Sequence, residues 1–150
     1  MAHGRTMAVP FEQKNIIVKL LILDNCSAVY GRLLELLGGI ERLGALSIAC
    51  SLAELPEKLI RLQPNVIVMD VDLPDGCSLL HIKKIRRQMP SARLYIFTNH
   101  YEYKNHTAAL EADAFFDKSL EYEQLIVQLL KDAEQLRTAL QKEGFYVAQH

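Results

Sequence analysis

Five short apolar runs alternate with segments of helical spacing along the chain, and this alternation limits the folds that the chain can adopt. The runs are KLLILD (19–24), LSIAC (46–50), VIVMD (66–70), RLYIFT (93–98) and AFFDK (114–118). Strands that are buried on both faces have such continuous apolar sequences, and they occur in parallel sheets whose connecting helices cover both sides. The pattern therefore predicts an α/β fold, a doubly wound five-stranded parallel sheet with helices on both faces.

The segments between these runs predict the helices and their starts. Helices are expected over 27–37, from 51 to about 63, over 77–89, near 102–111 and from 120 to about 142. Ser27 stands where it could cap the first helix, and Ser51 and Glu54 have the S-x-x-E spacing of a capping box at the second. Pro56 falls about one turn later, so we expect that helix to begin late or to bend.

Composition narrows the class of protein. The chain has 150 residues, half of them apolar, which is enough for the core of one domain. A formal net charge of −1 gives no field that would bind nucleic acid or an anionic membrane directly, and we expect neither partner. Three widely spaced cysteines, Cys26, Cys50 and Cys77, with no signal peptide and no long apolar run, predict reduced thiols in the cytoplasm.

Polar side chains end four of the five predicted strands. The first strand ends in Asp24 and Asn25, the third in Asp70, the fourth in Thr98 and the fifth in Lys118. Because the carboxyl ends of parallel strands meet at one edge of a sheet, where ligands of such folds bind, we expect these side chains to lie together. Two carboxylates can be neighbours when a divalent cation lies between them, and oxygen ligands with retained water suit Mg²⁺.

With these motifs the chain resembles the receiver domain of bacterial two-component response regulators, the CheY-like superfamily. The resemblance depends on LILDN, VIVMDVDLPDG, IFT and FFDKS, in that order and at suitable spacings. It covers 17–135, and it implies the flavodoxin-like strand order 2-1-3-4-5. Residues 1–16 are expected to form a loose N-terminal segment, and 136–150 an extension of the last helix with a C-terminal tail.

The resemblance implies a phosphorelay function. Asp70 would accept a phosphoryl group from a histidine kinase or a phosphotransfer protein, assisted by Lys118 and Thr98. The implied Mg²⁺ ligands are Asp24, Asn25, Asp70 and the backbone carbonyl of Asp72. The implied switch residues are Thr98, at the end of strand four, and Phe115, on strand five. The face that an output protein would bind is implied to be formed by helix four, strand five and helix five. The only chemistry implied is the domain's own phosphorylation and hydrolysis, not catalysis on another substrate.

The sequence departs from the receiver pattern at three places. Asn25 replaces the second acid at the end of strand one, so Mg²⁺ should bind less tightly, unless the Asp72 carboxylate partly replaces that charge. Asn99 stands where a small residue is usual, and Ser119 replaces a proline, so we expect a trans peptide bond there. A receiver that works as a phosphorylation-independent interaction or dimerisation module is therefore the alternative function.

The segment after Lys118 contains the features that bear on output domains and dimerisation. Only 32 residues follow Lys118, too few for an output domain, so we expect a receiver that stands alone or is cut from a longer regulator. The last helix has a seam at steps of four and three, which predicts core packing in its first half and a homodimer through its end. The seam is Tyr122, Ile126, Leu129, Ala133, Leu136 and Leu140. The basic run at Lys83, Lys84, Arg86 and Arg87 is interpreted as a solvated helix face.

Overall fold

The five predicted strands form one parallel sheet in the computed structural model, which describes residues 18–38 and 44–148. The strands are β1 (Lys19–Leu23), β2 (Ala45–Ala49), β3 (Val66–Met69), β6 (Arg93–Thr98) and β7 (Ala114–Asp117). Their order is β2-β1-β3-β6-β7, and each neighbouring pair is parallel. The predicted 2-1-3-4-5 order is therefore confirmed, whereas the predicted loose segment 1–16 lies outside the described residues.

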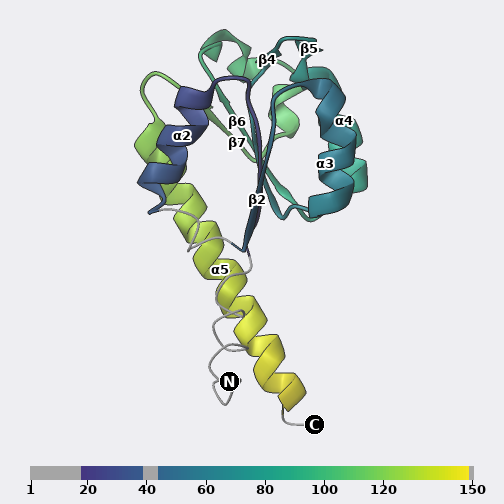
Figure 1. The fold of residues 1–150 in the computed structure, drawn as a ribbon, viewed down its shortest axis with the longest axis vertical. Helices are drawn as coiled ribbons and strands as arrows, with labels where there is room; N and C mark the ends of the chain where they lie inside the picture. The colour runs from purple at the N-terminus through teal and green to yellow at the C-terminus, as the bar shows by residue number, and fades with distance from the viewer. Residues whose placement is uncertain (1–17, 39–43, 149–150) are drawn as a thin grey trace, which may run out of the picture.

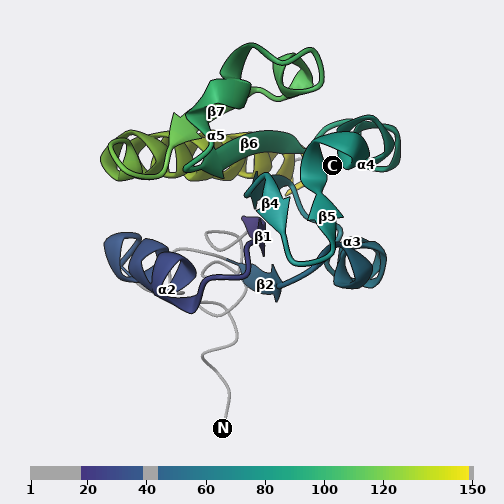
Figure 2. The same ribbon diagram turned by 90° about the horizontal axis from the view of Figure 1, so that it is seen from above.

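Helices cover both faces of this sheet. Figures 1 and 2 show α2 (Ser27–Leu36) and α5 (Tyr122–Ala148) on one face, and α3 (Leu55–Leu62) and α4 (Ile82–Gln88) on the other. Successive strand side chains point to opposite faces, so Leu20 and Ile22 enter the layer under α2 and α5, while Leu21 and Leu23 enter the layer under α3 and α4. The two layers form the core, and α5 continues well past the sheet (Figure 1).

Neither predicted serine cap forms. Ser27 is already the first residue of α2, and the residue before it, Cys26, donates its N–H to Asp24 Oδ1 at 2.8 Å. Residues Leu52–Glu54 form the 3₁₀ turn η3, and the Ser51 hydroxyl bonds only to the Glu54 side chain, at 3.4 Å. The late start of the second helix is confirmed, because α3 begins at Leu55 with Pro56 in its first turn.

A short hairpin, absent from the sequence-based prediction, follows β3. It pairs β4 (Asp72–Leu73) with β5 (Gly76–Cys77) in antiparallel register. The 3₁₀ turn η4 (Ser78–His81) then leads into α4. The helix predicted from residue 77 therefore begins as a 3₁₀ turn and becomes α-helical only at Ile82, because the hairpin holds the residues before Ser78 in extended conformation.

The prediction of a helix near 102–111 is wrong. The segment forms two 3₁₀ turns, η5 (Tyr101–Asn105) and η6 (Ala109–Glu111). His106 separates them with extended backbone, at φ −66° and ψ 140°, and its ring nitrogen Nδ1 accepts the Ala108 N–H at 3.1 Å. That local side-chain bond competes with continuation of a helix. The part of the expected switch face assigned to helix four therefore consists of two short turns.

The first half of the predicted seam on α5 packs in the core, as expected. Ile126 and Leu129 are buried under the sheet, and Leu136 packs partly against the same layer. The side chain of Leu140 lies outside the described residues, and dimerisation through the end of this helix stays a prediction. Across 18–38 and 44–148, no helix is long and apolar enough to span a membrane.

The predicted solvated basic face on α4 has one exception. Lys83, Lys84 and Arg87 are exposed. Arg86 instead bonds to the Ala92 carbonyl oxygen at 2.6 Å and to the Asp113 carboxylate at 2.6 Å. This arginine therefore ties α4 to the segments before β6 and β7.

Candidate functional site

Three strand ends bring two carboxylates and one ammonium group into contact. The Lys118 Nζ atom, just after β7, lies 2.8 Å from Asp24 Oδ2 and 2.8 Å from Asp70 Oδ2. Asp24 follows β1 and Asp70 follows β3, which is the middle strand of the sheet. Together with Thr98, the last residue of β6, these residues form what we call the strand-end site.

The site is buried unevenly. The Asp24 side chain retains 4% of its accessible surface and Lys118 6%, whereas Asp70 retains 14%. Asp70 Oδ1 accepts the N–H of the next residue, Val71, at 2.7 Å, so one oxygen is held by the backbone and the other by Lys118. Asp70 is therefore the carboxylate of the pair that an incoming molecule can reach.

The charges at the site do not balance. Burial raises the pKa of the Asp24 carboxyl, although the hydrogen bond from Lys118 acts in the opposite direction. Burial alone would lower the pKa of Lys118, but its bonds to Asp24 and Asp70 outweigh that effect and raise it. Lys118 therefore stays charged, and two carboxylates share a single positive charge, a deficit that an added cation would correct.

Thr98 lies at the site but is engaged locally. Its side chain is fully buried, and its Oγ1 accepts the N–H of His100 at 3.2 Å. Its backbone oxygen accepts the Lys118 N–H at 2.9 Å, which fixes the end of β7 against the end of β6. Phe115, on β7, is half-buried, and its ring packs edge-on against Tyr101 of η5 with 5.6 Å between centroids.

The remaining predicted metal ligands lie at the rim. The side chains of Asn25 and Asp72 are exposed. Among the residues that the structure describes, no group of three or more His, Cys, Asp or Glu side chains is placed to hold a metal ion. The donors that Asp24, Asp70 and the Asp72 carbonyl would supply are oxygens, which fit Mg²⁺ in kind, but an ion there has to share both carboxylates with Lys118.

The residues at the two other departures from the receiver pattern, Asn99 and Ser119, contact each other. Asn99 Oδ1 accepts the Ser119 hydroxyl at 3.0 Å, so the amide is tied across the ends of β6 and β7. The peptide bond before Ser119 is trans, as expected, since the described part of the chain contains no cis peptide.

The structure also places His100, which was not among the predicted site residues, beside the exposed Asp72. Its Nε2 lies 3.6 Å from Asp72 Oδ2 and its Nδ1 lies 3.5 Å from Glu102 Oε2. With Val71, Cys77 and Tyr103 it lines a cavity of about 210 Å³ beside Asp72. Its position two residues after Thr98, at the end of a predicted strand, was the sequence feature that could have placed it near the site.

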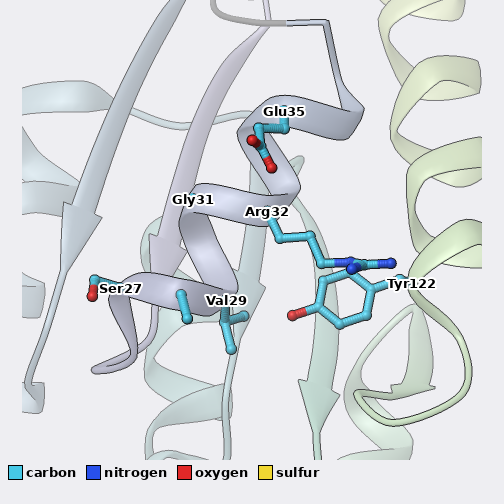
Figure 3. A pocket seen from close by; sticks show the side chains of 7 residues that line it. Ser27, Val29, Gly31, Arg32, Glu35 and Tyr122 are labelled. Atoms are coloured by element: carbon cyan, nitrogen blue, oxygen red, sulfur yellow. The ribbon is translucent and has the colours of Figure 1, made fainter.

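A groove of about 590 Å³ runs along α2 and is bounded by Tyr122, the first residue of α5 (Figure 3). In it the Arg32 guanidinium lies over the Tyr122 ring, 4.8 Å from the centroid. The same ring packs edge-on against Phe97 of β6, with 4.8 Å between centroids. These contacts hold the start of α5, and with it the segment after Lys118, against α2 and the sheet.

Comparison with known proteins agrees with this geometry, although no family model matches the chain. The chain is 32% identical over 96 residues to the DNA-binding transcriptional activator DevR/DosR of Mycobacterium tuberculosis, covering 64% of this chain and 43% of that protein. It is 33% identical over 107 residues to a protein-glutamate methylesterase/protein-glutamine glutaminase of Hahella chejuensis, covering 69% of this chain and 28% of that protein. The chain thus spans less than half the length of these curated relatives.

Solved structures match the fold over most of the described chain. A CheY-like response regulator receiver domain protein from Methanospirillum hungatei superposes with a TM-score of 0.69 at 20% identity, covering 82% of this chain and 98% of that one. The response regulator TrrA from Thermotoga maritima, in complex with Mg²⁺-BeF, gives a TM-score of 0.66 at 21% identity, covering 77% and 98%. The fold is that of a CheY-like receiver domain, and the predicted resemblance to response regulator receivers is confirmed.

Proposed function

We propose that Asp70 is the phosphoacceptor of a two-component phosphorelay and receives its phosphoryl group from a histidine kinase or a phosphotransfer protein. The observation that supports this most directly is the Lys118 ammonium, held 2.8 Å from both Asp70 and Asp24 at the carboxyl ends of the strands. Asp70 is the more exposed of the two carboxylates and directly follows the middle strand, β3.

The proposed transfer needs charge neutralisation more than covalent help from the protein. An Asp70 carboxylate oxygen attacks phosphorus, the bond from phosphorus to the donor's leaving group breaks, and the leaving group departs with that electron pair and takes up a proton. Lys118 neutralises charge on the acceptor and then on the phosphoryl oxygens. The Thr98 hydroxyl would turn from its local bond with His100 to donate to one of those oxygens.

Mg²⁺ is the proposed cofactor, and when bound it would supply further positive charge against the phosphoryl oxygens. Asp24, Asp70 and the Asp72 carbonyl would hold it, with Asn25 contributing an amide oxygen at most. Because Asn25 lacks the negative charge that a second acid would add, we expect weak Mg²⁺ affinity. A contribution from the Asp72 carboxylate would offset part of that loss.

The proposed output is a change in the surface formed by β7, α5 and the 3₁₀ turns η5 and η6. Movement of Thr98 toward the phosphoryl group would vacate space that Phe115 could enter, separating its ring from Tyr101. An output protein in the cytoplasm would read this surface, and the domain's only chemistry would be its own phosphorylation and hydrolysis.

Incubation with phosphoramidate or acetyl phosphate and Mg²⁺, followed by intact mass measurement, tests the acceptor. We expect one phosphoryl adduct on the wild-type chain, none on Asp70→Asn, and none without Mg²⁺. Glu57→Gln is the control, because Glu57 is an exposed carboxylate in the first turn of α3, and its adduct should persist. A wild-type chain without an adduct, or an adduct that persists in Asp70→Asn, would contradict the assignment.

The alternative function is a protein-interaction or dimerisation module that does not depend on phosphorylation. The observation favouring it is that α5 runs from Tyr122 to Ala148 and continues well past the sheet (Figure 1). A homodimer through this helix would give twice the chain mass in light scattering, whether or not phosphoramidate is present. A monomer at tens of micromolar would count against the dimer.

A further inference from the structure

The loop that follows the acceptor is closed at its base by a buried serine. Ser78 is fully buried, and its Oγ donates a hydrogen bond to the backbone carbonyl oxygen of Asp70 at 2.5 Å. Its N–H donates to the carbonyl oxygen of Val71 at 2.9 Å. A buried hydroxyl needs a partner, and here the partner is the acceptor residue itself. Ser78 therefore restrains the peptide from which the Asp70 side chain projects.

The tip of the same loop is attached to a different element. The two carboxylate oxygens of Asp75 accept the N–H groups of Leu52 and Ala53 at 2.8 and 2.9 Å. These two residues open η3, so Asp75 performs the capping that the S-x-x-E spacing predicted for Ser51. The contact links the hairpin to the segment between β2 and α3.

Glycine at 76 permits this close approach. Gly76 has φ +148°, which residues with a side chain rarely adopt, and an added Cβ would lie 3.1 Å from Leu52 Cδ1. The backbone conformation at Gly76 therefore brings the loop tip against η3. The Asp75 hydrogen bonds form because of this conformation and are not an incidental surface contact.

Between the two attachments lies the Asp72 peptide. Asp72 is paired with Cys77, and the neighbouring pair, Val71 and Ser78, is joined by a backbone hydrogen bond. In an antiparallel ladder, hydrogen-bonded pairs alternate with pairs that exchange no backbone bonds. This register puts the Asp72 carbonyl oxygen outside the ladder, where it is available to an ion at the strand-end site.

We propose that Ser78 and Asp75 are positioning residues for phosphoryl transfer, which clamp the hairpin at its base and tip and so hold the Asp70 carboxylate and the Asp72 carbonyl in register for Mg²⁺. The inference rests on the proposed function of Asp70. It extends that function to two residues that touch neither the ion nor the phosphoryl group.

The test compares Ser78→Ala and Asp75→Asn with two controls of the same chemical change. Ser47→Ala removes a hydroxyl from the half-buried strand β2, and Glu57→Gln removes a charge from the exposed first turn of α3. For each variant the phosphoramidate labelling rate is measured as a function of Mg²⁺ concentration. Hydrogen–deuterium exchange of the 71–77 peptide and urea unfolding are measured on the same samples.

A clamp that positions the site predicts a specific pattern. Loss of one hydrogen bond that holds the reactive geometry should slow labelling at low Mg²⁺ by about fivefold. The Mg²⁺ concentration for half-maximal rate should rise, so high Mg²⁺ should recover part of the rate. Exchange in 71–77 should become faster in both clamp variants, while both controls behave as wild type.

The outcomes separate the two hypotheses. If the wild type takes a phosphoryl group and both clamp variants show wild-type rate and Mg²⁺ dependence, the clamp is overturned and the proposed function stands. If the wild type takes none, the proposed function is overturned, and positioning for phosphoryl transfer with it. Should Ser78→Ala fail to fold, Asp75→Asn decides the matter, because Asp75 is exposed and its substitution leaves the core intact.

Discussion

Two buried carboxylates of the fold, Asp24 and Asp132, have opposite surroundings. Asp24, at the end of β1, shares the Lys118 ammonium with Asp70. Asp132, on α5, is fully buried and has three hydrogen-bond donors. It accepts hydrogen bonds from Arg93, Tyr95 and Gln128. One carboxylate competes for a cation, whereas the other is saturated by donors.

This difference separates the proposed phosphoacceptor site from a carboxylate that joins two elements of the fold. At the strand-end site the charges are not balanced, so a new cation or a phosphoryl group can change which groups Lys118 and Asp70 contact. At Asp132 the carboxylate joins α5 to β6, and an exchange of partners would leave buried donors without acceptors. The two buried acids therefore differ in whether the cation that each contacts is shared with a second carboxylate.

The largest expected effect comes from removing the shared cation. Lys118→Met leaves Asp24 and Asp70 facing each other without compensation, which should lower the free energy of unfolding by about 3 kcal/mol. Urea unfolding measures this loss, and labelling of Asp70 should stop. The double variant Asp24→Asn with Lys118→Met should recover part of the stability, because it removes one of the unpaired charges. Equal stability of Lys118→Met and wild type would show that the ammonium does not hold this site together.

A smaller effect is expected at the saturated carboxylate. Asp132→Asn weakens the bonds to Tyr95 and Arg93 and should lower the free energy of unfolding by about 2 kcal/mol. The phosphoramidate labelling rate of the folded variant should equal that of wild type, because Asp132 lies on α5 and its partners on β6, Arg93 and Tyr95, precede the strand end at Thr98. A slower labelling rate at unchanged stability would contradict the distinction drawn between the two carboxylates.

The smallest effect concerns pH. Burial raises the pKa of Asp24 above 3.8, so the folded state holds this proton more tightly than the unfolded chain does. Its contribution to the free energy of unfolding should therefore fall as pH rises from 3.8 through the raised pKa. Measured in urea across that range, the wild type should lose stability relative to Asp24→Asn. A difference between the two proteins that stays constant with pH would mean that Asp24 does not titrate in this way.

Much of the site was predictable because the information is local in sequence. An apolar run that ends in Asp24, Asp70 or Lys118 identifies both the strand and its carboxyl end, and parallel topology brings those ends to one edge. The contacts of Lys118 with both acids are what that reasoning led us to expect.

Other features could not be read from neighbouring residues. The cap of η3 comes from Asp75, more than 20 positions along the chain, and not from Ser51. Two of the three donors to Asp132, Arg93 and Tyr95, lie on β6, which is more than 30 positions from Asp132 in sequence.

The sequence by itself determined the class of fold, the position of each strand along the chain and the residues that end the strands, because periodicity and strand ends depend on near neighbours. Only the tertiary structure decided which donor each buried acid meets, and how the hairpin after Asp70 is anchored. A side chain takes the partner that lies within hydrogen-bonding distance in space, and that distance is set by how remote segments pack, not by their spacing along the chain.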